Sequence, residues 1–171
     1  MKLVAATDPI LRAELERFDF SNPPVNPMEL AQELIEFMYE NNGLGLAANQ
    51  VGLPYRVFVM RGNSDTGDIV CFNPRVVDVG EKEALMEEGC LSYPGLLVKI
   101  KRPQSIKVRF QLPDGDTTTQ TFAGLSSRVF QHELDHLNGV VHVDRASRFH
   151  KDQALRKQKK LLRTVDIRAA V

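Results

Sequence analysis

The apolar positions of this chain change their spacing from helical to strand-like and back again. In the first quarter, Leu30, Leu34 and Met38 recur every four residues, which indicates the buried stripe of an α-helix. Asn26 suits the N-cap of such a helix, and Pro27 suits its first position. We therefore expect an amphipathic helix that begins at Pro27 and ends near the Asn-Asn-Gly sequence that follows residue 40.

From residue 55 onward the apolar residues come in short runs instead. These runs are rich in β-branched and aromatic residues, and Gly, Pro, Asn and Asp separate them, which is typical of strands joined by turns. The Pro-Asp-Gly sequence at 113–115 predicts a hairpin turn. The predicted strands are 56–60, 69–72, 75–77, 84–86, 96–100, 106–110 and 117–122.

Helical spacing returns at residues 126–139, with Phe130, Leu134 and Leu137 as the buried stripe. Ser126 or Ser127 can cap the start of this helix, and a glycine at 139 can end it. The tail from Ala146 to about Thr164 is also predicted to be helical. This order predicts an α+β fold, with mixed or antiparallel sheets around the helix at 126–139 and a helix near each terminus. With 171 residues, we expect one domain over 1–171.

Composition and charge narrow the functional classes. The chain is 43% hydrophobic, which is ordinary for a globular protein. Its formal net charge is zero, so no overall electric field attracts nucleic acid, and we expect no specific nucleic-acid partner. No apolar run reaches the length of a membrane span, and no signal-peptide pattern opens the chain. Two cysteines make no disulfide framework, and Cys71 lies in an apolar run typical of a core. We expect a cytoplasmic monomer without membrane contact.

The helix at 126–139 contains the sequence His132-Glu133-Leu134-Asp135-His136, an H-E-x-x-H motif. Its histidines lie one turn apart on the same face, where two imidazoles can hold one metal ion. Glu133 lies about 100° around the helix, close enough to take a proton from a water on that metal. Such motifs also occur by chance in ordinary helices, but two of the four histidines of the chain lie here.

A catalytic metal needs a third protein ligand, and the sequence offers two candidates. His142 completes the longer H-E-x-x-H-x-x-G-x-x-H pattern of metzincin peptidases. That pattern needs a downstream methionine turn, yet all five methionines precede residue 87. His142 also lies in an apolar run, 140–144, that resembles a short strand. The second candidate, Cys90 in the sequence Glu-Gly-Cys-Leu-Ser, is favoured.

The segment Gly43-Leu-Gly-Leu-Ala-Ala-Asn-Gln50 superficially matches a dinucleotide fingerprint. That fingerprint should follow a strand and open a helix, whereas this segment follows a helix, so we do not expect nucleotide binding. Its small residues instead favour either a tight packing corner or close approach of a peptide backbone.

Three segments together resemble the motifs of the peptide deformylase family: 43–50, 88–92 and Gln131–His136, in the order of that family. The resemblance covers nearly the whole chain. It implies removal of the formyl group from N-formylmethionine on newly made polypeptides, with release of formate. It also implies a metal, Fe²⁺ with Zn²⁺, Ni²⁺ or Co²⁺ as possible replacements, held by Cys90, His132 and His136. A metzincin-like or other zincin peptidase that uses His142 is the alternative.

The resemblance further assigns roles at the reacting group. Glu133 would be the general base, and the backbone N–H of Leu91 and the side-chain amide of Gln50 would stabilise the oxyanion. We expect Asp135 to pair with an arginine such as Arg102. By position, the methionine pocket would be lined by Leu44, Met86, Leu125 and Val129, and the substrate backbone would pair near Leu44, Gly45 and Gly89.

The tail carries a marked positive charge. Residues 148–171 hold eight Lys and Arg and two Asp, a surplus of +6. A solvated helix face explains such a run, and contact with the ribosome through the C-terminal helix is the functional alternative.

Overall fold

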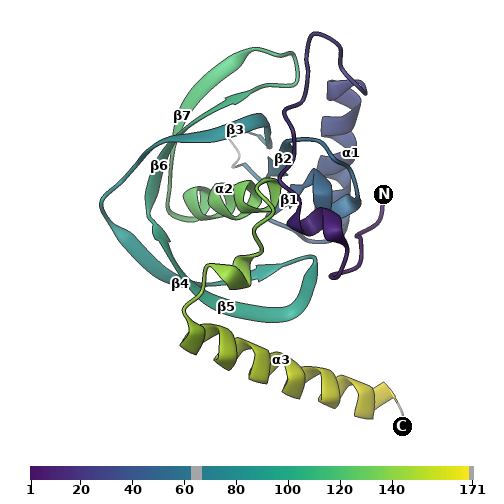
Figure 1. Ribbon diagram of the computed structural model, residues 1–171, viewed down its shortest axis with the longest axis vertical. Helices are drawn as coiled ribbons and strands as arrows, with labels where there is room; N and C mark the ends of the chain where they lie inside the picture. Colours follow the sequence, from purple (N-terminus) through teal and green to yellow (C-terminus); the bar gives the residue numbers. More distant parts are fainter. Residues whose placement is uncertain (63–66, 170–171) are drawn as a thin grey trace.

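A computed structural model describes residues 1–62 and 67–169, with side chains up to residue 162. Two antiparallel sheets enclose one helix, α2 (Gly124–Leu137), which lies between them in Figure 1. The five-stranded sheet has the order β1-β2-β3-β6-β7, and β4 and β5 form a separate two-stranded sheet. The predicted α+β fold, with sheets around the H-E-x-x-H helix, is therefore confirmed.

The remaining helices lie outside these sheets. Helix α1 begins at Pro27 as predicted, because the Asn26 side chain accepts hydrogen bonds from the N–H groups of Met28 and Glu29. Helix α3 packs against β5 and extends away from the body in Figure 1. Of the basic tail, residues 170–171 and the side chains from 163 onward lie outside the described part. The other element bounds are η1 (Pro9–Arg12), α1 (Pro27–Glu40), β1 (Gly45–Ala47), η2 (Ala48–Val51), β2 (Val57–Met60), β3 (Ile69–Val79), β4 (Glu83–Cys90), β5 (Tyr93–Pro103), β6 (Ser105–Gln111), β7 (Thr117–Ala123), η3 (His142–Asp144) and α3 (Arg148–Ala169).

The core explains why α2 is held so firmly. Phe130 is fully buried on α2 and meets Phe58 of β2 edge-on, with 5.0 Å between the ring centroids. Phe110 and Phe122 reach it from β6 and β7. Aromatic contacts of this kind exclude water from a large apolar area. The opposite side of α2 is therefore presented to β4 and β5 in a fixed orientation.

Three local predictions were wrong. Helix α2 begins at Gly124, with Ala123 as its N-cap, so neither Ser126 nor Ser127 caps it; Ser127 is buried and donates to the carbonyl of Pro103. Predicted strands 69–72 and 75–77 are one strand, β3, which continues through a bulge. His142 lies in the 3₁₀ turn η3 rather than in a strand. The expected left-handed glycine after α2 is confirmed at Gly139, whose φ is +69°.

The buried role of Cys71 is confirmed, since β3 places it fully inside the core. Within the part of the chain that the structure describes, none of the helices has both the length and the apolar composition needed to cross a lipid bilayer.

Candidate active site

Three residues converge where the β4–β5 hairpin meets α2. Cys90 ends β4, and His132 and His136 lie one turn apart on α2. Their ligand atoms all lie within 4.8 Å of one another, and Cys90 Sγ is 3.2 Å from His136 Nε2. Among the described residues, these form the one group of three His, Cys, Asp or Glu side chains that could hold a metal ion. The ligands predicted from the sequence are therefore brought together.

His132 is oriented by a buried carboxylate. Its Nδ1–H donates to Glu88 Oε2 over 3.0 Å, which directs the other ring nitrogen away from Glu88 and leaves it for a metal. Burial lowers the pKa of His132, but hydrogen bonds with Cys90 and Glu88 raise it to about 10. A metal ion bound by His132 therefore has to displace a proton.

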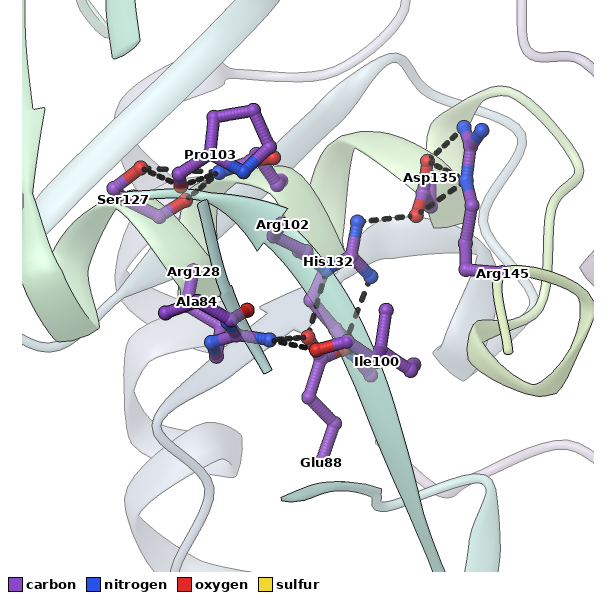
Figure 2. A network of polar contacts seen from close by, with 11 residues as sticks. Ala84, Glu88, Ile100, Arg102, Pro103, Ser127, Arg128, His132, Asp135 and Arg145 are labelled. Carbon is purple, nitrogen blue, oxygen red and sulfur yellow. Dashed lines mark hydrogen bonds and ion pairs between the residues drawn. The ribbon is translucent and has the colours of Figure 1, made fainter. Parts of the chain in front are cut away.

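Glu88 is itself held by two arginines, as Figure 2 shows. Arg102 donates from Nε and Nη2 to the two carboxylate oxygens over 2.7 and 3.0 Å, and Arg128 donates over 2.6 Å. Burial raises the pKa of Glu88, but the hydrogen bonds from His132 and Arg102 lower it to about 2. Glu88 is therefore a carboxylate that accepts from three side chains at once.

The expected pairing of Asp135 with Arg102 is confirmed. Arg102 Nη1 donates to Asp135 Oδ2 over 2.8 Å, and Arg145 donates to the other oxygen over 2.5 Å (Figure 2). Arg102 thus links Glu88 on β4 to Asp135 on α2, although it lies on β5 itself. This link sets the position of the hairpin, and so of Cys90, relative to the histidines.

The backbone of His136 is held by a side chain from the segment 43–50. The Asn49 side chain on η2 donates to the backbone carbonyl of His136 over 2.7 Å and to the carbonyl of Ile10 over 3.2 Å. Burial holds the pKa of His136 well below its usual value, so its ring is neutral and can act as a ligand.

Glu133 lies against the first motif with its carboxylate buried. Gly45 makes this possible, because a Cβ on residue 45 would lie 2.5 Å from Glu133 Oε1. Oε2 of Glu133 is buried without a hydrogen-bond partner among the described residues. Burial raises the pKa of Glu133 to about 7. A carboxylate with a pKa near neutrality can both take and return a proton.

Gln50 lies beside the cysteine. Its Nε2 group is 3.5 Å from Cys90 Sγ and donates to Ser92 Oγ over 3.1 Å, while its Oε1 accepts from the backbone N–H of Ala47. Leu91 follows Cys90 in the turn between β4 and β5. The structure therefore brings both predicted oxyanion donors to the edge of the same cavity as Glu133.

That cavity has a volume of about 380 Å³. Of the pocket residues predicted from the sequence, Met86 is not among the described residues that line the cavity; it is 44% exposed on β4. Sequence reasoning missed Arg128 and Leu97. The only available signal for Arg128 was its position one helical turn before His132. The predicted residues that line the cavity are Leu44, Gly45, Gly89, Leu125 and Val129.

His142 lies near the site without joining the group. It is buried, its ring centroid is 5.6 Å from that of His132, and its Nε2 is 3.2 Å from the carbonyl of Leu96, to which it can donate. Burial and the charge of His132 lower its pKa to about 4. It therefore packs behind His132 as a neutral ring, which does not fit the metzincin pattern.

The chain matches a family model described as polypeptide deformylase over residues 1–152. The chain belongs to the polypeptide deformylase family. It is 41% identical to the peptide deformylase of Thermotoga petrophila over 82% of this chain and 83% of that protein. Crystal structures from Plasmodium falciparum and Thermotoga maritima are also similar. The Plasmodium falciparum structure has a TM-score of 0.84 at 30% identity, and the match covers 97% of this chain and 98% of that protein. The Thermotoga maritima structure has a TM-score of 0.79 at 38% identity, and the match covers 85% of this chain and 97% of that protein.

These similarities confirm the prediction of a deformylase that acts at the N-termini of polypeptides, and they favour it over the metallopeptidase alternative. The family is metal-dependent, and the donor set of this deformylase fits a metal. One thiol and two imidazoles are within reach of one ion, and His132 already has its second nitrogen bonded to a carboxylate. Three protein ligands leave a coordination position for water or substrate, as catalytic sites do.

Proposed function

We propose that Cys90, His132 and His136 hold the metal of this deformylase and that Glu133 is its general base and acid. The observation that carries this assignment is the carboxylate of Glu133, which is buried on the helix that carries the two histidines and has one oxygen without a partner among the described residues. We propose Fe²⁺ as the resident ion, with Zn²⁺, Ni²⁺ or Co²⁺ able to replace it, because a thiolate with two imidazoles suits such metals. When bound, the ion supplies a Lewis acid that polarises the formyl carbonyl and acidifies water.

The side chains then divide the work of hydrolysing the formamide. Glu133 takes a proton from the attacking water while the water oxygen bonds to the formyl carbon. The amide of Gln50 and the N–H of Leu91 donate to the formyl oxygen as it becomes negative. Glu133 returns the proton to the methionine nitrogen as the C–N bond breaks, and formate leaves. The raised pKa of Glu133 suits it to both proton transfers.

The substrate is proposed to be held by the walls of the cavity. The methionine side chain would contact Leu44, Leu125 and Val129, while the peptide backbone would pair beside Gly45 and Gly89 as an added strand. Leu44 and Leu125 are about half exposed, so a bound side chain would cover apolar surface that is now in water.

Formate release from an N-formyl-Met tripeptide tests the assignment. Iron-loaded protein prepared without oxygen is compared with Cys90→Ala, Glu133→Gln and His142→Ala. We expect Cys90→Ala to lose both metal and activity, and Glu133→Gln to keep the metal but lose about 10²–10⁴-fold in kcat. His142→Ala should keep the metal and most of its activity. Loss of metal from His142→Ala but not from Cys90→Ala would reverse the ligand assignment.

We also propose that residues 1–171 act as one monomeric domain in the cytoplasm, where a reducing environment preserves the Cys90 thiolate. Its partners would be formylated nascent chains and the ribosome, the latter through α3. That helix is anchored at Pro94, whose carbonyl accepts from Gln158, and it exposes Arg156 and Lys157. Cosedimentation with ribosomes should weaken with salt and in the double variant Arg156→Gln/Lys157→Gln, whereas hydrolysis of the tripeptide should not change.

A further inference from the structure

A second hollow lies on the solvent side of the five-stranded sheet, formed by residues that the deformylase site does not use. It has a volume of about 400 Å³, and its lining includes Arg17, Arg75, Arg109 and Thr117. Arg75 and Arg109 come from β3 and β6, neighbours in the sheet of Figure 1, and Arg17 comes from the segment before α1. Within the described part of the chain, none of the three guanidinium groups forms an ion pair or a side-chain hydrogen bond. Three positive charges therefore share one hollow, and no acidic residue is among the described residues that line it.

A bulge in β3 creates this arrangement. The pairing with β6 shifts register between Phe72 and Arg75, and Asn73 in between has a φ of +51°, which is unusual for a residue other than glycine. After the shift, Arg75 lies directly opposite Arg109. Like charges at opposed positions destabilise a sheet, and bulges commonly re-aim a side chain. The bulge thus places two positive side chains, Arg75 and Arg109, opposite each other, and their repulsion does not stabilise the sheet.

Asn73 also holds the backbone beside Arg17, the third arginine. Its Oδ1 accepts from the N–H of Phe18 over 2.7 Å, and its Nδ2 donates to the Phe18 carbonyl over 2.9 Å and to Gln111 Oε1 over 2.8 Å. These bonds hold the backbone next to Arg17 against the sheet. One strained residue therefore places both Arg75 and Arg17 at the hollow, and strain of this kind gathers at functional sites.

We propose that Arg17, Arg75 and Arg109 form a binding site for a phosphate group. Guanidinium groups form paired hydrogen bonds with phosphate oxygens, and a multiply charged phosphate would relieve the repulsion between Arg75 and Arg109. The Thr117 hydroxyl adds a further donor at the same hollow. The chain as a whole has no net charge, so the attraction is local to this hollow.

Calorimetric titration with pyrophosphate at low ionic strength tests the site. We expect Arg75→Gln and Arg109→Gln each to weaken binding at least tenfold. Lys107→Gln is the matched control, because Lys107 is exposed on the same face of β6, two residues from Arg109, yet does not line the hollow. That variant should weaken binding less than threefold. Pyrophosphate should also raise the melting temperature of the wild type but not of Arg75→Gln.

Two further titrations separate the sources of the phosphate. If a six-nucleotide RNA competes with pyrophosphate and binds more tightly, the phosphate group that the site recognises belongs to a nucleic-acid backbone. If only pyrophosphate binds, the ligand is a small phosphate compound. Either result supports the site. Absence of binding, equal binding by Arg75→Gln and the wild type, or equally tight binding of citrate overturns it. Formate release by all of these variants is expected at the wild-type rate, so the outcome is independent of the active-site assignment.

Discussion

A single methyl group added at Gly45 should disable the proposed general base. The Cβ of Gly45→Ala would lie 2.5 Å from Oε1 of Glu133 and 2.8 Å from its Cγ and Cδ. An unstrained carbon–oxygen contact measures about 3.3–3.6 Å, so the carboxylate would have to move by roughly 1 Å. Glu133 cannot escape into solvent, because it is buried on the face of α2 that β1 covers.

The expected losses follow from that displacement. Misplacing a reacting group by about 1 Å costs on the order of 10²-fold in rate, so kcat for formate release should fall by about that factor. Overpacking should also reduce the free energy of unfolding by about 1–3 kcal/mol. Metal content should not change, because the three atoms nearest to the added methyl all belong to Glu133. Steady-state kinetics, metal analysis and chemical denaturation measure these three quantities.

The double variant Gly45→Ala/Glu133→Gln shows whether the loss acts through the carboxylate. If it does, the double variant should be no slower than Glu133→Gln alone, because residues that act as a unit are non-additive. Gly89→Ala is the comparison on the cavity wall, since its Cβ would meet only the flexible and exposed side chain of Leu97 among the described residues. Because the peptide is proposed to pair beside Gly89, its effect should appear in KM and not in kcat or metal content. Full activity of Gly45→Ala, or additive losses in the double variant, would show that the added methyl does not act through Glu133.

Three further results are expected. Glu88→Gln should lower the free energy of unfolding by about 3–5 kcal/mol in denaturant titrations, because it leaves the buried charge of Arg102 without its nearest carboxylate. It should also weaken metal binding about 10–100-fold in competition with a chelator. Gly139→Ala should lower the free energy of unfolding by about 2–5 kcal/mol, because φ is +69° there and a Cβ would lie 2.4 Å from the carbonyl oxygen of Arg12. A smaller loss of stability than that of Asn138→Ala would contradict this. Removal of metal by a chelator should lower the melting temperature of the wild type. The melting temperature of Cys90→Ala should not change, because that variant is expected to hold no metal.

The three side chains that converge at the candidate metal site, and the helix that carries two of them, could be predicted from the sequence alone. The spacing of His132 and His136 depends only on helix geometry, and Asn26 caps α1 through contacts within a few residues. Features of this kind are local, so a single chain segment contains the information that determines them. The order of the three motifs then linked Cys90 to the histidines.

The features that sequence reasoning missed depend on contacts between distant segments. The sequence analysis assigned no contact to Glu88 or Arg128, yet both are buried and Arg128 donates to Glu88 across 40 residues of chain. His142 suits a strand by composition, but packing behind His132 places it in a turn. The bulge at Asn73 was also missed, because the Asn-Pro sequence read as a break between two strands rather than a shift of register within one.

The separation of the ligands along the chain has a consequence for how the protein is made. Cys90 and His136 are 46 residues apart. At a synthesis rate of about 5–20 residues per second, the cysteine is made roughly 2–9 s before the second histidine. During that interval the candidate metal site is incomplete, and the thiol lacks at least one of its two histidine neighbours. Each new copy of the protein therefore passes through a stage in which Cys90 is an ordinary free cysteine, open to oxidation or to capture by another metal.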